Sequence, residues 1–472
     1  MDRASSSLLD PRLDPRRGRI GGDLWILAAV LTLEGALLGL GLGGRAPLAA
    51  TALALGVLYL LLAVRSPEIA WGLAFAATPF SVEVLLPIGG AITVPTEPMV
   101  ALALLGWLAR CLIGGGLRLQ ASPLHRPLGV LAATALVSVL LCSHAGVGLK
   151  AWVVTGAYAA FGYLYVVTTP CDAARRERWV RLAAWVGAAW GLYGAARVLV
   201  LGVSLRSAYG AARPFFTEHG TYAAFVSMLL PVALFEALER RGRARVGFAA
   251  AAFAMLLGVT FSFTRAAWLS LIVVLPLALG LWARTRRSVR RLGLPAALVA
   301  ATAIAIFSFG VGGRLARHAG TAVEAENVSN LERVNRWMAA WEMTKDHPWL
   351  GVGYGTYPDV YPSYRRKLIV TELAYRHMGV HSEPLRLLSE TGVLGLLAGL
   401  WFLVVAGVAG VRSFRRAQDP AEGRLALGVT AGLATYAVHG LFNSYLGIDK
   451  VTLPFWLGLG VLASMSGRAR HR

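Results

Sequence analysis

The sequence predicts an all-α polytopic membrane protein with about 12–14 transmembrane helices and one large extracytoplasmic helical loop. Hydrophobic residues make up 56% of the 472 residues and charged residues only 15%, whereas about a quarter of a soluble domain is charged. Many apolar runs reach about 18 residues or more, the length that crosses a bilayer core. A β-barrel would instead alternate in segments of about 10 residues.

The apolar runs divide the chain into about fourteen predicted spans. The first span is longer than the hydrophobic part of a signal peptide and no small-residue cleavage site follows it, so we interpret it as an uncleaved anchor. The predicted spans cover about 24–43, 47–64, 69–88, 97–115, 128–146, 151–168, 179–203, 219–238, 247–264, 266–282, 294–311, 391–411, 425–443 and 453–467. The pair 247–264 and 266–282 is open to a second interpretation, a single broken hairpin.

The net charge of +21 comes almost entirely from arginines in short loops between spans. With fourteen spans, every arginine cluster falls on the side of the N-terminus, which the positive-inside rule identifies as cytosolic. No basic stripe with interleaved aromatic residues indicates nucleic-acid binding. The three cysteines lack CxxC spacing and indicate neither a disulfide framework nor a metal site.

This pattern predicts five regions along the chain. They are a cytosolic basic tail at 1–23, a first transmembrane part at 24–311, a periplasmic loop at 312–390, the last spans at 391–467 and a cytosolic tail at 468–472.

The long loop contains one predicted helix and one glycine-rich turn. Ser329 and Glu332 have capping-box spacing. The apolar residues that follow fall near one side of the helix, which predicts packing of that side on the membrane domain; they are Leu331, Val334, Trp337, Met338 and Trp341. The stretch GVGYG (351–355) follows a helix and has no P-loop lysine, so it does not indicate a nucleotide site. The tyrosines after it favour interfacial anchoring or, alternatively, contact with sugar rings.

His381 is the best candidate for proton transfer. It precedes Ser382, Glu383 and Pro384, which have the order of N-cap, N1 and N2 of a helix. The positive end of the helix dipole disfavours a protonated imidazole, and a neutral imidazole suits a general base. The alternative is a loop histidine with a local capping role.

Arginines are the candidates for binding an anion. Arg265 is the only charge in a long apolar stretch, which indicates either a functional residue at membrane depth or a hairpin tip at the interface. Arg206 and Arg213 lie in an outer loop where arginine is otherwise scarce, and Arg333 lies in the loop helix. Guanidinium groups bind phosphate oxygens in pairs of hydrogen bonds. Because the sequence has no DxD, GxSxG or HExxH, we expect arginines rather than a metal to neutralise a leaving group, and no cofactor.

Four stretches resemble the O-antigen ligase and Wzy-type O-antigen polymerase superfamily. HSEPLRLLSETGVLG (381–395) is similar to its signature His-[Asn/Ser/Gln]-x9-Gly-x-x-Gly. Arg333-x-x-x-Trp337 with DHPWLGVGYGTY (346–357) resembles the segment before that signature, and TRAAW (264–268) and RPFFTEHGTYAAF (213–225) resemble two further segments. The chain departs from the family pattern in Thr264, where serine is usual, in Ser382, where asparagine is commoner, and in a predicted span count above the family's twelve.

The resemblance implies a GT-C-like glycosyltransferase that moves a glycan from undecaprenyl diphosphate to an acceptor hydroxyl, without a metal or nucleotide sugar. His381 would activate the acceptor hydroxyl. The residues implied to hold the pyrophosphate are Arg213, Arg265, Arg206 and Arg333. Candidate contacts to the acceptor or sugar are Glu218, Tyr354, Tyr357 and Asp449.

The implied partners are a lipid-linked donor, membrane lipid and either a growing glycan or lipid A core as acceptor, in lipopolysaccharide or exopolysaccharide biosynthesis. The implied place is the bacterial inner membrane, with cytosolic termini and a periplasmic active site. Two other interpretations stay open. One is a transporter or flippase of lipid-linked sugars, although the candidate polar residues gather on one face rather than at the midplane. The other is an assembly partner without activity, which would leave His381 and Arg265 unexplained.

Overall fold

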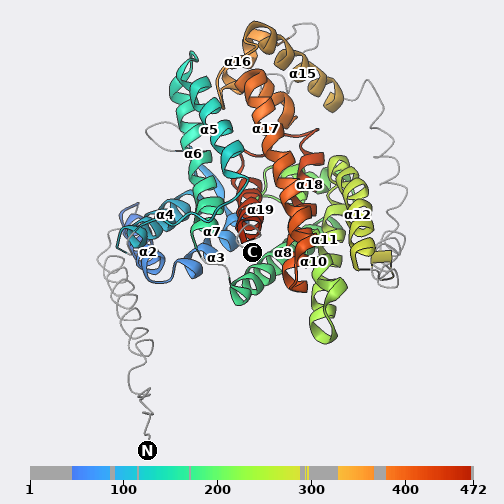
Figure 1. Cartoon of the computed structure of the whole chain (residues 1–472). Helices are drawn as coiled ribbons and strands as arrows, with labels where there is room; N and C mark the ends of the chain where they lie inside the picture. The colour runs from blue at the N-terminus through green and yellow to red at the C-terminus, as the bar shows by residue number, and fades with distance from the viewer. Residues whose placement is uncertain are drawn as a thin grey trace, which may run out of the picture.

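The computed structural model describes residues 45–85, 91–113, 116–169, 172–286, 293, 295–296, 328–365 and 379–468. These residues form a bundle of helices with one short antiparallel hairpin (Figure 1). Seven of the described helices are long and apolar enough to cross a membrane. The structure therefore confirms the predicted all-α polytopic membrane fold.

The elements follow one another along the chain with mostly short connections. They are α2 (Arg45–Arg65), α3 (Pro67–Ala77), η1 (Thr78–Phe80), β1 (Val82–Leu85), β2 (Ala91–Val94), α4 (Thr96–Ile113), α5 (His125–Leu140), α6 (Ala145–Ala159), η2 (Ala160–Leu164), α7 (Tyr165–Thr168), α8 (Ala173–Val200), α9 (Leu205–Ala211), α10 (His219–Glu239), α11 (Gly242–Phe261), α12 (Arg265–Arg286), α15 (Val328–Asp346), α16 (Tyr357–Tyr364), α17 (Glu383–Arg416), α18 (Pro420–His439) and α19 (Asp449–Arg468).

Helix α10 is the centre of the bundle, because every residue from Gly220 to Leu238 is buried. It packs against α8, α11 and α18. Small residues allow these helices to approach closely: a Cβ added at Gly191 would overlap the backbone of Ala254, and one added at Gly432 would overlap the carbonyl of Met228. Close approach at small residues is how helices associate in lipid, where the hydrophobic effect gives no drive.

Ion pairs gather three arginine-bearing loops at one end of the bundle, which we call the arginine-rich end. Arg176 of α8 pairs with Glu422 at 3.1 Å, and Arg424 pairs with Glu236 at 3.0 Å. Arg240 also pairs with Glu236, at 2.8 Å. Residues 172–178, 236–242 and 416–424 therefore share one side, in agreement with the predicted common side of these arginine clusters.

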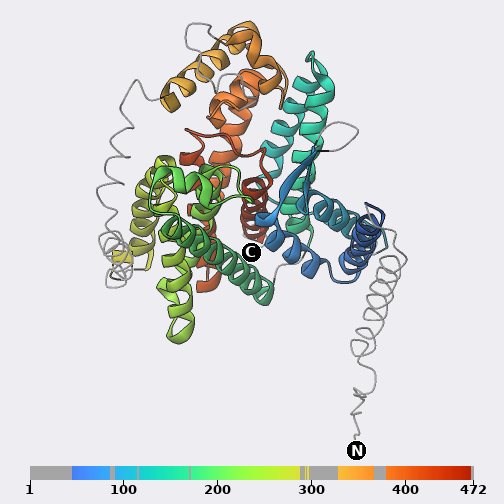
Figure 2. The same cartoon turned by 180° about the vertical axis from the view of Figure 1, so that it is seen from behind.

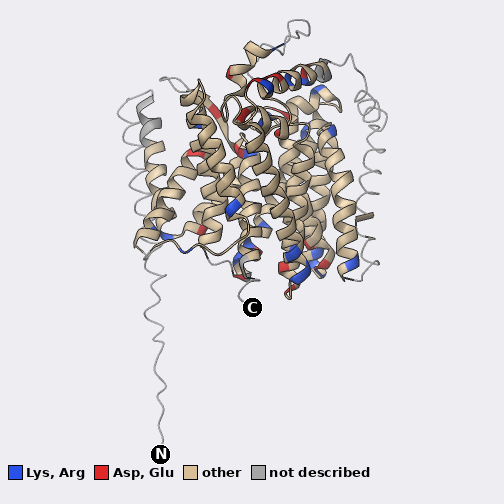
Figure 3. Ribbon diagram, turned by 45° about the horizontal axis from the view of Figure 1, so that its top comes forward, with Lys and Arg blue, Asp and Glu red and all other residues tan. Residues whose placement is uncertain are grey.

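The loop helices lie at the opposite end. Helix α17 is 34 residues long with a break inside it, so its two ends are at most about 50 Å apart. Helices α15 and α16 sit over its first turns, and charged residues gather towards the two ends of the bundle rather than in its middle (Figure 3). The start of α17, which carries the histidine motif, is therefore far from the arginine-rich end.

The predicted span 69–88 is wrong. Helix α3 has only 11 residues, and the chain continues through η1 into a hairpin in which Val82 pairs with Val94. Pro79 interrupts helical hydrogen bonding, and the β-branched residues on both sides of the turn favour extended strands. The hairpin lies beside α6, whose Lys150 Nζ donates to the carbonyl of Ala91 at 3.3 Å (Figure 2).

The other predicted spans have mixed outcomes. The pair 247–264 and 266–282 forms two separate helices, α11 and α12, each long and apolar enough to span. Helix α17 begins at Glu383, inside the predicted loop, and continues through the predicted span 391–411. The predicted span 24–43 and nearly all of 294–311 lie outside the described residues.

The predicted orientation of α15 is also wrong. Val334 and Trp341 are exposed, while Glu332, Arg336 and Met343 are buried against the neighbouring helices. The salt bridge between Arg336 and Glu332, with an Nε–Oε1 distance of 2.6 Å, makes this possible, because a paired charge can be buried where an isolated one cannot. The spacing of apolar residues therefore predicted the helix correctly, but not which of its faces packs against the rest of the protein.

Candidate functional site

Helix α17 is broken at Gly392, and the segment 348–353 crosses the break. Gly392 has φ 66° and ψ −168°, a conformation that is essentially confined to glycine. Backbone groups that a break frees inside a protein need new partners. Four hydrogen bonds of 2.8–3.4 Å supply them: Val393 N to Pro348 O, Leu394 N to Trp349 O, Val352 N to Ser389 O and Gly353 N to Glu390 O.

The glycines of both motifs are needed for this crossing. A Cβ at Gly392 would overlap the backbone of Trp349, and a Cβ at Gly351, which has φ 67°, would overlap the backbone of Glu390. At Gly395 a Cβ would overlap the side chain of Thr391. The motif Gly-x-x-Gly and the glycine-rich turn at 351–355 thus belong to two backbone segments that contact each other.

His381 lies directly before α17 with a left-handed backbone, φ 59°. The predicted helix start is confirmed: Ser382 is the N-cap and Pro384 is in the first turn. The pKa of His381 is lowered from 6.5 to about 4, mainly by burial and also by the charges of Arg333 and Arg336. The imidazole is therefore neutral at neutral pH, as predicted, but burial rather than the helix dipole is the main cause.

Glu383 fixes the start of α17 to the end of α18. Its Oε1 accepts from the hydroxyl of Tyr436 at 2.7 Å and from the N–H of Leu446 at 2.9 Å, and its own N–H donates to Gly440 O at 2.7 Å. On its other side, Arg386 donates to Glu383 Oε2 at 2.8 Å. These bonds hold the residues next to His381 in one place.

Arg333 has the most central position among the predicted arginines. It acts electrostatically on His381 and His439, and also on Tyr209, Glu218 and Tyr445. Burial raises the pKa of Glu218, although Tyr445 and Arg333 oppose this. The charge of Arg333 therefore influences groups on or next to α9, α10, α17 and α18.

Arg265 lies at the first residue of α12 and is partly buried. Burial raises the pKa of Tyr209 and the charge of Glu218 adds to this, whereas Arg333 and Arg265 both lower it. The two arginines therefore share a neighbour. Arg206, on α9, and Arg213, just after α9, are exposed, and no described contact joins either to His381.

Two of the predicted sugar contacts have partners inside the protein. The hydroxyl of Tyr357 donates to Arg336 O at 2.9 Å, and burial raises its pKa above the usual value. The hydroxyl of Tyr354 donates to Thr155 Oγ1 at 3.0 Å, and its ring packs under the guanidinium of Arg386.

The third, Asp449, is buried at the start of α19. It accepts from Ser81 and lies 3.6 Å from Lys450 Nζ, which joins α19 to η1 rather than to His381. Glu218, in contrast, is the N-cap residue of α10 and lies beside Arg333.

Sequence reasoning missed three residues of this region: Tyr209, Arg336 and His439. His439 is fully buried at the end of α18, within the predicted span 425–443. A histidine in an otherwise apolar span was the available signal, since ionisable residues inside membrane segments are functional candidates. Within the described residues, no group of three or more His, Cys, Asp and Glu side chains is arranged to hold a metal ion.

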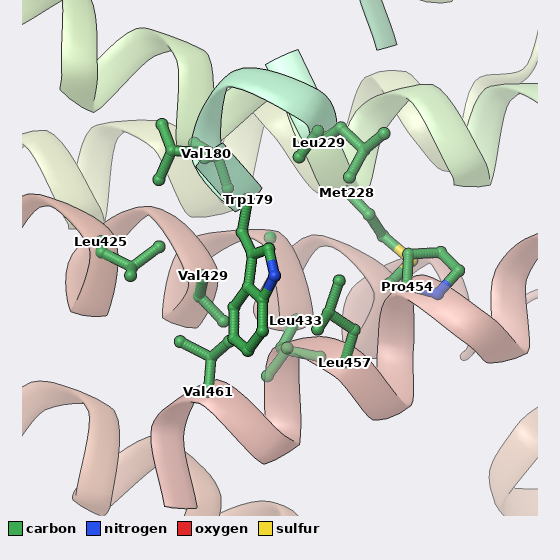
Figure 4. Close-up of a pocket in the computed structure, with 14 residues that line it drawn as sticks. Trp179, Val180, Met228, Leu229, Leu425, Val429, Leu433, Pro454, Leu457 and Val461 are labelled. Atoms are coloured by element: carbon green, nitrogen blue, oxygen red, sulfur yellow. The ribbon is translucent and has the colours of Figure 1, made fainter. Parts of the chain in front are cut away.

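A separate cavity of about 50 Å³ lies between α8, α10, α18 and α19 (Figure 4). Trp179 projects among Val429, Leu433 and Val461 there, and none of the lining residues is charged. The cavity thus offers no group for acid–base chemistry, and Trp179 belongs to the arginine-rich half of α8. The candidate site is therefore the region around His381 and Arg333.

Comparison with known protein families gives one match. Residues 250–400 match the family model described as O-antigen ligase. The matched range includes Arg265, Arg333, His381 and the broken segment of α17. No curated protein matches the chain.

Proposed function

We propose that this chain, whose residues 250–400 match the family model of O-antigen ligases, transfers a glycan from a lipid-linked diphosphate donor to an acceptor hydroxyl. One observation carries the proposal. The charge of Arg333 acts on a histidine that is neutral at neutral pH, and the charges of Arg333 and Arg265 both act on Tyr209. A base next to a cationic site has the two functions that such a transfer requires.

The reaction follows from these roles. The acceptor hydroxyl gives its proton to His381 while its oxygen attacks the anomeric carbon of the donor sugar. The bond between that carbon and the diphosphate oxygen breaks, and its electron pair leaves with the lipid diphosphate. Arg333 and Arg265 offset the negative charge of the leaving group, and fixed cations in a site with little water do this strongly. Attack on the face opposite the diphosphate inverts the anomeric configuration.

The proposal includes the setting of the reaction. The donor is an undecaprenyl-diphosphate-linked glycan, the site is on the periplasmic face of a bacterial inner membrane and has a GT-C-like arrangement, and arginines replace a metal ion. The arginine-rich end then faces the cytosol, as the positive-inside rule favours. The acceptor distinguishes two activities: a lipid A core makes the protein a ligase, and a growing glycan makes it a polymerase.

The test is glycan transfer by the purified chain in a reconstituted membrane, with a lipid-diphosphate oligosaccharide donor and EDTA. The variants are Arg265→Ala and His381→Asn, since asparagine tolerates the left-handed backbone of residue 381 better than alanine does. We expect transfer to survive EDTA and to fall about 10²–10⁴-fold in His381→Asn, the usual contribution of general acid–base catalysis. A single added unit identifies a ligase, and a ladder of products identifies a polymerase.

A transporter or flippase of lipid-linked sugars gives the opposite result. The native chain would then move the donor across the membrane without forming a product, and His381→Asn would leave that movement intact. Equal transfer by the native chain and both variants would refute the assignment of the site.

A further inference from the structure

His439 is a buried histidine whose place in the reaction is unassigned. It is the last residue of α18 and has no exposed surface. Neither ring nitrogen has a hydrogen-bond partner among the described residues. A neutral imidazole has one N–H donor and one acceptor nitrogen, so both capacities of this ring lack a protein partner in the described parts of the chain.

The two tyrosines packed against the ring donate their hydroxyl protons to other groups. Tyr436 stacks at a centroid distance of 6.5 Å, but its hydroxyl donates to Glu383. Tyr445 lies at 5.7 Å, and its hydroxyl donates to Asn443 Oδ1 at 3.1 Å. Neither hydroxyl therefore donates to the acceptor nitrogen of the ring.

The cation that acts on His439 is Arg333, and the carboxylate of Glu383 is bonded to the stacked Tyr436. Arg333 and His219 are the groups that act on it electrostatically, and no described carboxylate forms an ion pair with Arg333, whereas the next arginine on the same helix face, Arg336, is paired with Glu332. A ligand that forms a hydrogen bond with the ring N–H of His439 must have an acceptor oxygen and must bind favourably next to the cation Arg333. An anionic oxygen meets both requirements, while a metal ion would be repelled by Arg333.

We propose that the ring N–H of His439 donates to a phosphoryl oxygen of the donor's diphosphate, beside Arg333. This inference rests on the proposed function and adds a neutral hydrogen-bond donor to its arginines. Buried polar groups are nearly always satisfied in native proteins, and an unsatisfied one destabilises the fold.

The inference predicts opposite effects of one substitution on stability and on binding. His439→Phe keeps a ring of similar size and removes the unsatisfied polar atoms, so the melting temperature of the ligand-free protein should stay the same or rise. The affinity for farnesyl diphosphate should fall about 10- to 100-fold, the usual effect of losing a hydrogen bond to a charged group. Farnesol, which lacks the phosphates, should bind native and variant protein equally.

A second histidine is the matched control. In His125 both ring nitrogens have partners, the carbonyl of Gln120 at 2.8 Å and the hydroxyl of Tyr163 at 2.9 Å. His125→Phe should therefore lower the melting temperature and leave the shift induced by farnesyl diphosphate unchanged.

Binding and transfer together separate the two proposals. If the native chain binds farnesyl diphosphate and His439→Phe loses that binding, the inference holds whether or not glycan transfer is found. If native and variant bind equally, or the native chain binds farnesyl diphosphate no better than farnesol, His439 is not a diphosphate ligand, and transfer by the native chain would still support the proposed function. A large fall in the melting temperature of ligand-free His439→Phe would also overturn the inference, because it would show a structural role.

Discussion

The two ends of the bundle differ in one arginine: Arg333, at the loop end, has no ion pair with a described residue, although Arg336 and Arg386 nearby are paired. At the arginine-rich end, carboxylates pair with the arginines: Arg176 contacts Glu422, and Arg240 and Arg424 share Glu236. At the other end, Arg333 has no ion pair with a described residue, and the groups around it are histidines, tyrosines and a carboxyl whose pKa burial raises. Paired cations stabilise structure, whereas cations without a carboxylate partner favour an anionic ligand.

Helix α15 contains both kinds of arginine within one turn. Arg336 is fully buried, pairs with Glu332 and lies over the ring of Tyr361 at 4.6 Å. Arg333, three residues earlier, is only partly buried, and its charge acts on His381 and His439. The comparison of the two ends can therefore be tested with two substitutions on one helix.

The largest expected effect comes from this pair. Arg336→Met leaves Glu332 buried without its main cation and should lower the stability by about 3–5 kcal/mol, as measured by thermal unfolding in detergent. Arg333→Met should leave the stability nearly unchanged and reduce transfer by about 10²–10³-fold, the range for loss of one group that stabilises developing charge. If Arg333→Met also unfolds the protein, the distinction between the two arginines is wrong.

The next largest effect is expected for a substitution at the break in α17. Gly392→Ala places a side chain at φ 66° and ψ −168°, against the backbone of Trp349. Such a backbone conformation costs about 1–3 kcal/mol for a residue with a Cβ, and the overlap adds to this. We expect a lower melting temperature and weaker transfer. Gly407, in the same helix, has nothing near its Cβ position, so Gly407→Ala is the control and should be neutral or slightly stabilising.

The pH dependence of kcat/KM and of kcat tests whether Arg333 and Arg336 influence the protonation state of His381. Its pKa, lowered from 6.5 to about 4, means that the free protein holds a neutral base until the pH falls towards 4, so kcat/KM should keep its value down to that region. A bound diphosphate opposes the charges of Arg333 and Arg336, so the acid limb of kcat should lie at higher pH.

The same shift affects stability. Because the folded pKa of His381 is below the unfolded one, its contribution to stability is fully present above pH 6.5 and is lost as the pH falls towards 4. Arg333→Met should move the acid limb of kcat/KM upward. An acid limb that stays at pH 6.5 in both proteins would show that His381 does not sense these cations.

Much of this arrangement could be predicted from the sequence. The apolar runs predicted the class of fold, and the helix start at Ser382 followed from local capping chemistry. The prediction of a span at 69–88 was wrong because a hydropathy count does not distinguish a short helix with a hairpin from a continuous span. The prediction of which face of α15 packs was wrong because the ion pair between Glu332 and Arg336 allows a charged face to be buried. A pattern of apolar residues does not show which charged residues form ion pairs.

The site was predictable only in part, for a related reason. His381, Arg265 and Arg333 carry chemistry that can be read from residue type and motif. The isolation of His439 and the contact of segment 348–353 with Gly392 depend on residues distant in sequence. The tyrosines after the glycine-rich turn suggest interfacial anchors or sugar contacts, whereas the hydroxyl of Tyr357 donates to Arg336 O, a bond between residues 21 positions apart in the sequence.

The smallest effect is expected for a substitution at an exposed residue of the arginine-rich end. Arg178 is more than half exposed and contacts Glu68 at 2.8 Å, and Glu68 also pairs with Arg175 at 3.2 Å. Exposed ion pairs contribute about 0–1 kcal/mol, and here Glu68 keeps a partner, so Arg178→Ala should change the melting temperature very little and transfer not at all. The salt dependence of unfolding checks the reason, because a screened surface pair predicts that native and variant converge as ionic strength rises. A loss of transfer in Arg178→Ala would instead show that the two ends of the bundle are coupled, and the division into structural and ligand-binding arginines would need to be abandoned.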